Sequence, residues 1–186
     1  GFIVQQNCDI KNCVLANNVI GNINDKSIEE ILGGEKNLKI KQQILSDQKP
    51  TSCAGCHKLE AGKKNFDIIS QRIYYIKELR KVDPALYDQI ENFDLHTVDI
   101  RWTNQCNQAC VYCGPHNSTL WEKEIGARRM MSPEAKTAVR SFIFDNVTKL
   151  KNVYLAGGEP MLMNENIEFL TLLLEKNPDV QLRVNT

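Results

Sequence analysis

The sequence predicts an α/β protein whose second half holds parallel β-strands joined by helices. Three observations predict it. From residue 96 the pattern runs strand, helix, strand, helix, strand with short links, which implies parallel strands and right-handed crossovers. The 186 residues are 42% hydrophobic and 25% charged, as in ordinary globular proteins. The seven cysteines are clustered rather than spread along the chain.

The first third of the chain is rich in loops and predicts two short helices. Residues 27–32 begin with a capping box, in which Ser27 and Glu30 satisfy each other's backbone N–H groups, and they end at two glycines. Residues 35–47 predict the second helix, which a proline then interrupts. We therefore expect a small cysteine-rich module of helices and loops over residues 1–65.

A helical linker is expected over residues 66–95. Isoleucine and leucine recur at helical spacing over residues 66–81, and a proline opens a further helical stretch over residues 83–93. These helices carry no recognisable chemistry, so we expect them to connect the two halves.

The last part of the chain, residues 96–186, carries the strand and helix alternation. Val98, Ile100 and Trp102 alternate with polar residues, the period of a strand. Strands are expected at 96–102, 152–157 and 180–185, and helices at 132–150 and 164–177. The chain starts without a methionine and stops at a strand that lacks a neighbour, so we expect a fragment of a longer protein.

The charge balance and the cysteine count limit the partners. The net charge is +0, which gives no electrostatic basis for binding nucleic acid or an anionic membrane. The sequence lacks an apolar run of about 18 residues and a signal peptide, so we expect a cytoplasmic protein. In that reducing compartment, clustered cysteines are more often metal ligands than disulfides.

Three of the cysteines, Cys106, Cys110 and Cys113, lie within eight positions after the first strand of the second half. A zinc site needs four ligands, so His116 or a distant residue would have to complete it. A [4Fe-4S] cluster held by three thiolates leaves one iron open to bind substrate. The carboxyl end of a strand in an α/β barrel is where such an open site is useful.

The cysteine spacing C-x3-C-x-aromatic-C, with Tyr112 as the aromatic residue, resembles the signature of the radical S-adenosylmethionine enzymes. The sequence AGGEP at residues 156–160 resembles their second motif, which contacts the amino group of the methionine moiety. The resemblance implies that residues 96–186 form the first half of a partial (β/α)6 TIM-like barrel. It also implies a [4Fe-4S] cluster that cleaves S-adenosylmethionine to a 5′-deoxyadenosyl radical, which abstracts hydrogen from a substrate.

The resemblance also implies a set of residues around S-adenosylmethionine. These residues are Tyr112, Gly157, Gly158, Glu159, Pro160 and Asn185. The glycines leave room for the backbone to approach a ligand. Glu159 either positions the amino group or lies at a helix N-terminus, where the macrodipole favours it. Tyr112 either shields the cluster, packs on adenine or is a simple core aromatic.

The remaining cysteines lie in the first third of the chain, at Cys8, Cys13, Cys53 and Cys56. Residues 21–56 resemble the twitch and SPASM modules of radical enzymes, which hold an auxiliary iron-sulfur cluster and usually follow the barrel. Two alternatives remain open. Four thiolates in separated pairs also suit a structural zinc ion. Residues 53–57 also fit the haem-attachment pattern C-x-x-C-H.

An enzyme is the first hypothesis, because a protein with purely structural cysteine sites has no need of the GGEP sequence. The resemblance implies a small electron donor of the flavodoxin or ferredoxin type and favours a peptide or protein substrate. It assigns no catalytic side chain. The alternative is a non-catalytic zinc-binding, iron-sulfur-binding or redox-carrier protein.

Overall fold

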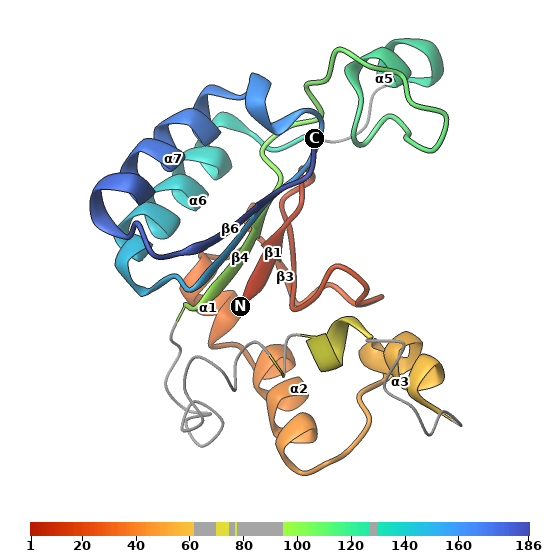
Figure 1. Ribbon diagram of the computed structural model, residues 1–186. Coiled ribbons are helices and arrows are strands. Elements are labelled where there is room, and N and C mark those ends of the chain that lie inside the picture. Colours follow the sequence, from red (N-terminus) through yellow and green to blue (C-terminus); the bar gives the residue numbers. More distant parts are fainter. Residues whose placement is uncertain (62–69, 75–76, 78–94, 127–129) are drawn as a thin grey trace.

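The computed structural model describes residues 1–61, 70–74, 77, 95–126 and 130–186. Its centre is one six-stranded sheet in the order β3-β2-β1-β4-β5-β6 (Figure 1). The strands are β1 (Phe2–Val4), β2 (Asp9–Lys11), β3 (Gly21–Asn22), β4 (Thr97–Ile100), β5 (Asn152–Leu155) and β6 (Gln181–Val184). Neighbouring strands pair in parallel from β1 through β4 and β5 to β6, whereas β2 pairs antiparallel with both β1 and β3.

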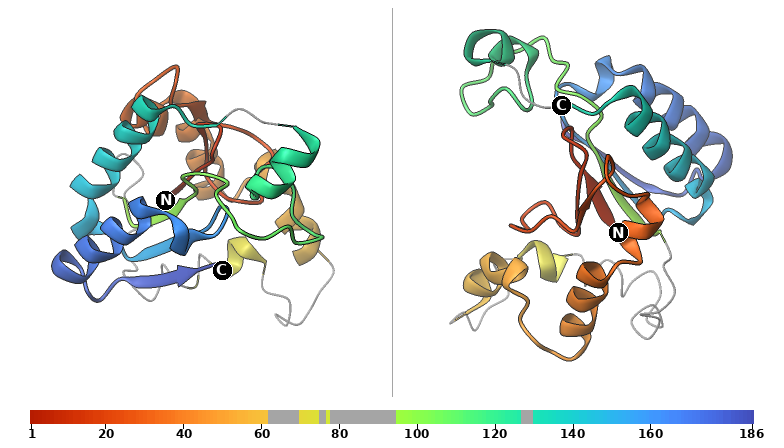
Figure 2. Two further views of the ribbon diagram at one scale, coloured as in Figure 1. Left: turned by 90° about the horizontal axis from the view of Figure 1, so that it is seen from above. Right: turned by 180° about the vertical axis from the view of Figure 1, so that it is seen from behind.

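The α/β class is confirmed, and the second half follows the expected order. Helix α6 (Pro133–Asp145) connects β4 to β5, and α7 (Asn164–Lys176) connects β5 to β6. The Ser132 hydroxyl accepts from the Ala135 N–H and so caps α6. Both helices cover the same face of the sheet (Figures 1 and 2), as right-handed crossovers require. The closed barrel that the resemblance implies stays a prediction.

The N-terminal module contains strands as well as the expected helices. Helix α1 (Ile28–Leu32) has the predicted capping box, and α2 (Glu35–Leu45) and α3 (Ala54–Glu60) follow it. However, β1, β2 and β3 add to the edge of the main sheet, with Phe2 opposite Val98. The expectation of helices and loops alone was wrong, because strands of two or three residues are too short to show an alternating pattern.

The helical linker lies mostly outside the described residues. Residues 71–74 are helical, in agreement with the helix expected over 66–81. The helix expected over 83–93 lies outside the described residues.

The core lies between the sheet and its helices. Val98 and Ile100 of β4, and Val153 and Leu155 of β5, are buried with Phe169 of α7. Each such side chain contributes about 1.5–3 kcal/mol through the hydrophobic effect. No helix in the described part of the chain is both long enough and apolar enough to span a bilayer.

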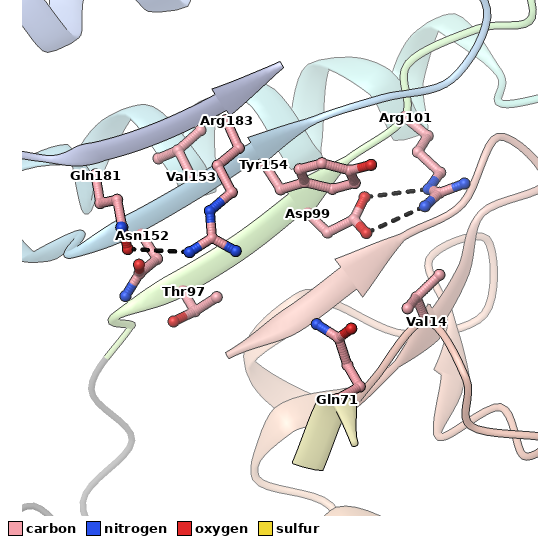
Figure 3. Close-up of a pocket in the computed structure, with 10 residues that line it drawn as sticks. All are labelled: Val14, Gln71, Thr97, Asp99, Arg101, Asn152, Val153, Tyr154, Gln181 and Arg183. Carbon is pink, nitrogen blue, oxygen red and sulfur yellow. Dashed lines mark hydrogen bonds and ion pairs between the residues drawn. The ribbon is translucent and has the colours of Figure 1, made fainter. Parts of the chain in front are cut away.

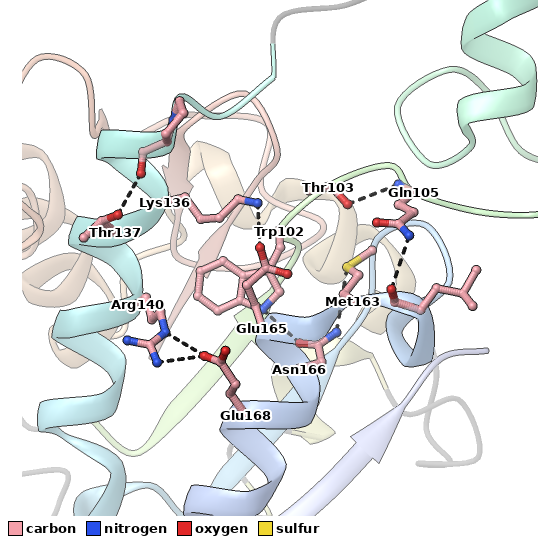
Figure 4. A network of polar contacts seen from close by, with 12 residues as sticks. Trp102, Thr103, Gln105, Lys136, Thr137, Arg140, Met163, Glu165, Asn166 and Glu168 are labelled. Carbon is pink, nitrogen blue, oxygen red and sulfur yellow. Dashed lines mark hydrogen bonds and ion pairs between the residues drawn. The ribbon is translucent and has the colours of Figure 1, made fainter.

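A buried hydrogen-bond network ties this core to the end of β4 (Figure 4). The indole N–H of Trp102 donates to the Asn166 Oδ1 at 2.9 Å, and both side chains are fully buried. The Asn166 Nδ2 donates in turn to the Pro160 carbonyl at 2.9 Å. Asn166 therefore joins β4, α7 and the turn that carries the GGEP sequence.

We predict that Asn166→Leu lowers the free energy of unfolding by about 2–4 kcal/mol, because two buried polar groups lose their partner. Urea denaturation measures the change. Glu168→Gln, an exposed substitution on the same helix, is the control and should shift stability by less than about 0.5 kcal/mol. Equal effects of the two substitutions would contradict the role given to Asn166.

Candidate metal and cofactor site

The cysteine loop occupies residues 101–118, between the end of β4 and helix α5 (Thr119–Ile125). Because β4 and β5 are parallel, this loop and the GGEP sequence both leave the sheet at its carboxyl edge. The cysteine loop and the GGEP sequence therefore meet at the carboxyl ends of the parallel strands, where α/β sheets bind ligands.

Side chains at the start of α5 hold the cysteine loop through its carbonyl groups. The Thr119 hydroxyl donates to the Cys106 carbonyl at 2.8 Å, and the Trp121 indole N–H donates to the Cys110 carbonyl at 2.9 Å. The buried Asn104 Nδ2 donates to the Pro115 carbonyl at 2.8 Å. The loop thus has side-chain support of its own, which sequence reasoning missed because none of these residues belongs to a motif.

The three thiols of the loop influence one another. Burial raises the pKa of Cys113, and the neighbouring Cys110 and Cys106 thiolates raise it further. Like charges held close together favour a bound cation, which would relieve their repulsion. The donor set therefore fits a thiophilic metal or cluster. Within the described residues, no group of three or more His, Cys, Asp and Glu side chains already has the arrangement of a metal site.

The two glycines of GGEP pack directly against the backbone of the cysteine loop. The Gly158 N–H donates to the Thr103 carbonyl at 3.2 Å, and the Glu159 N–H donates to the Gln105 carbonyl at 2.7 Å. A Cβ at Gly158 would lie 2.1 Å from the Gln105 oxygen, and Gly157 has φ +121. The sequence suggested that the glycines leave room for a ligand. In the structure, the absence of their side chains lets the backbone of the cysteine loop approach closely.

The other residues expected around S-adenosylmethionine lie at the same edge. The Glu159 carboxylate accepts from the Met161 N–H at 3.0 Å, so it occupies the start of a 3-10 turn, Pro160–Leu162. Tyr112 is 86% exposed beside Cys110, which excludes a core role. The Asn185 N–H donates to the Leu155 carbonyl at 3.0 Å, just beyond β6.

The N-terminal cysteines separate into two places. Burial raises the pKa of Cys13, and the thiolates of Cys56 and Cys53 raise it further, so Cys13 lies within electrostatic range of both. Cys8 is fully buried within the hydrophobic core and has φ 70. It lies in the turn after β1, and therefore at the carboxyl edge, whereas Cys13 follows β2, which runs back to the opposite edge.

A polar cluster that the sequence did not reveal lies next to Cys53 and Cys56. The Arg72 guanidinium donates to both carboxylate oxygens of Glu60, and the Ser70 hydroxyl donates to one of them. The hydrogen bond to Glu60 raises the pKa of Arg72, and the charges of the two thiolates raise it further. Arg72 falls in the helical linker, so sequence reasoning gave it no role.

Comparison with known proteins gives two similar enzymes. The chain is 29% identical over 101 residues to a GTP 3′,8-cyclase of Nautilia profundicola. This matched segment covers 54% of this chain and 30% of the relative. The chain is 25% identical over 100 residues to a GTP 3′,8-cyclase of Sulfurimonas denitrificans, over 54% of this chain and 28% of the relative. The chain thus spans less than a third of the length of these curated relatives. No family model and no solved structure matches it.

These relatives support the radical S-adenosylmethionine superfamily. GTP 3′,8-cyclase is a radical S-adenosylmethionine enzyme, and the similarity extends over about half of the chain. It supports the superfamily suggested by the cysteine loop and GGEP, and it gives no support to a twitch or SPASM subtype.

We predict that Gly158→Ala lowers the free energy of unfolding by about 2 kcal/mol, because the new methyl group must push two backbone segments apart. Gly114→Ala, on the cysteine loop itself, is the matched control, since a Cβ there meets nothing within 4 Å. Urea denaturation of both variants measures the difference. A Gly158→Ala variant as stable as the control would show that the two loops do not pack in this way.

Proposed function

We propose that this chain belongs to an enzyme that binds a [4Fe-4S] cluster through Cys106, Cys110 and Cys113 and reductively cleaves S-adenosylmethionine. When bound, the reduced cluster would supply the electron that breaks the sulfonium bond and yields the 5′-deoxyadenosyl radical. The three thiols share one braced loop, and their mutual repulsion suits a cationic centre.

The observation that carries the proposal is the direct backbone contact between the cysteine loop and GGEP. Hydrogen bonds from Gly158 and Glu159 to the start of the cysteine loop fix the distance between the two motifs. An enzyme that binds cluster and S-adenosylmethionine side by side requires such a fixed distance. A zinc loop or a redox carrier would need neither the second motif nor its contact.

Different residues of the chain would then contact different parts of S-adenosylmethionine. The backbone of residues 157–160 would receive the methionine end, next to the partly exposed Glu159 carboxylate. The exposed ring of Tyr112 lies beside the Cys110 thiol and would cover the cofactor. Asn185, at the end of β6, would form part of the same edge.

We further propose that Cys13, Cys53 and Cys56 hold an auxiliary iron-sulfur cluster, as in a twitch-like module, or a zinc ion. Cys13 lies within electrostatic range of the other two thiols, and Arg72 next to Cys53 and Cys56 would offset the charge of bound thiolates. The buried position of Cys8 in the core favours another residue as the fourth ligand.

The remaining parts of the proposal concern the whole protein. A peptide or protein is the proposed substrate, and a small flavodoxin or ferredoxin is the proposed electron donor, in the cytoplasm. The competing hypothesis is a non-catalytic zinc-binding, iron-sulfur-binding or redox-carrier protein. Cleavage of S-adenosylmethionine separates the two, because only the enzyme catalyses it.

We predict that replacing Cys106, Cys110 or Cys113 by Ala abolishes S-adenosylmethionine cleavage, because each thiolate is one of only three protein ligands to the cluster. The assay measures 5′-deoxyadenosine formed by the anaerobically reconstituted, reduced full-length protein. Cys8→Ala is the matched control and should retain cleavage. Cleavage that survives in any of the three loop variants would overturn the assignment.

A second prediction identifies the metal at the N-terminal site. With two clusters, the reconstituted full-length protein should contain about eight irons, and the Cys53→Ala, Cys56→Ala double variant about four, on the stoichiometry of a [4Fe-4S] cube. With zinc, the parent should contain about four irons and one zinc, and the variant should lose only zinc. Elemental analysis distinguishes these outcomes. A parent with about four irons and no zinc would refute both.

A further inference from the structure

The two faces of strands β4, β5 and β6 differ in character. The face covered by α6 and α7 is apolar, whereas the opposite face carries two rows of polar side chains (Figure 3). The pairing register aligns Asp99 with Tyr154 and Arg183 in one row. The second row consists of Thr97, Asn152 and Gln181.

This polar face lines a pocket of about 290 Å³. Gln71 and Val14 lie across from the strands, so segments from both halves of the chain enclose it (Figure 3). Parallel sheets in α/β proteins are normally apolar on both faces, because helices cover each face. The polar face of these parallel strands departs from that pattern, because most of its side chains are exposed or half-buried, and it suits a ligand site.

Two of the charged groups in the pocket neutralise each other. The Arg101 guanidinium donates to both oxygens of Asp99, at 3.1 and 3.2 Å, and the Asp99 side chain is only 4% exposed. A bidentate pair of this kind satisfies the donors and acceptors that it joins. Asp99 and Arg101 therefore add little net charge to the pocket.

The third charged group, Arg183, is not neutralised in this way. Its guanidinium carbon lies 4.5 Å from the centre of the Tyr74 ring, and its Nη2 donates to the Gln181 amide oxygen at 3.4 Å. Both partners are neutral, and no ion pair of Arg183 with a carboxylate occurs within the described residues. Among the described residues, those lining the pocket thus carry one excess positive charge.

The geometry points to an anion-binding pocket, in which Arg183 binds a carboxylate or phosphate group of the substrate. A guanidinium stacked on an aromatic ring keeps its N–H edge free to pair with two oxygens of an anion. The side chains of Asn152, Tyr154 and Gln71 provide neutral donors around it. The pocket lies on the strands that carry the cysteine loop and GGEP, so describing the anion as a substrate group rests on the proposed function.

The test is a calorimetric titration of the full chain with inorganic phosphate and, separately, with succinate, at 0.15 M NaCl. We expect saturable binding of at least one of these probes, and the stronger one identifies a phosphate or a carboxylate as the preferred group. Arg183→Gln should weaken the affinity about tenfold or more, because a charge-assisted bidentate contact is lost. Arg183→Lys keeps the charge but loses the planar guanidinium that can form two hydrogen bonds to one anion, so it should retain part of the affinity.

The matched control is Arg140→Gln, which removes the same charge from the opposite side of the sheet. Arg140 also lies over an aromatic ring, that of Phe144, but it pairs with Glu168. Its loss should leave the affinity within about twofold of the parent, since it makes no contact with the pocket. No saturable binding of either probe, or an equal loss in Arg140→Gln and Arg183→Gln, would overturn the pocket.

Failure of this inference is distinguishable from failure of the proposed function. Anion binding is measured without S-adenosylmethionine, and cleavage of S-adenosylmethionine by the parent is measured without the anion. Binding that depends on Arg183 in a protein that does not cleave S-adenosylmethionine would keep the pocket and reject the enzyme. Cleavage of S-adenosylmethionine by a protein that binds neither phosphate nor succinate would keep the enzyme and reject the anion-binding pocket.

Discussion

The contact between the backbones of residues 103–105 and 157–159 is the constraint on which the candidate site depends. It exists because β4 and β5 are parallel neighbours, so both loops emerge at the same edge of the sheet. Gly158 makes it possible, since any larger residue would place a Cβ 2.1 Å from the Gln105 oxygen. Asn166 stabilises this contact from within the core, because it is hydrogen-bonded both to Trp102, just after β4, and to the Pro160 carbonyl. The geometry of the site is thus fixed by main chain and core before any cofactor binds.

The N-terminal module contributes β1 and Cys8 to the same end of the sheet, whereas its other cysteines lie elsewhere. Strand β1 extends the sheet next to β4, and the Gln6 side chain in the following turn donates to the Asn117 Oδ1 at 3.2 Å. The module therefore braces the cysteine loop. Because β2 runs antiparallel, Cys13 returns to the opposite edge, near Cys53 and Cys56. The cysteine loop and the group of Cys13, Cys53 and Cys56 therefore lie at opposite ends of the strands of one sheet.

The sequence predicted the features that local patterns determine. Strands β4 to β6, helices α6 and α7 and the capping box of α1 follow from periodicity and capping, which act within a few residues. Strands β1 to β3 are too short to show a pattern, and they form because a neighbouring strand is present. The contact of Gly158 with Gln105 joins residues 53 positions apart in the chain, so the motif revealed the glycine but not what it touches. Asn166 and Arg183 carry no motif, and only their partners in space give them a role.

The difference between the two faces of the sheet links folding to function. Burial of Val98, Ile100 and their neighbours against α6 and α7 stabilises the strands from one side. The opposite face can then carry charged groups, because the hydrophobic contribution does not have to come from both sides. Asp99 and Arg101 meet the cost of burying charge by pairing with each other. Arg183 does not pair in this way, and its exposed guanidinium is available to an anion from outside the chain.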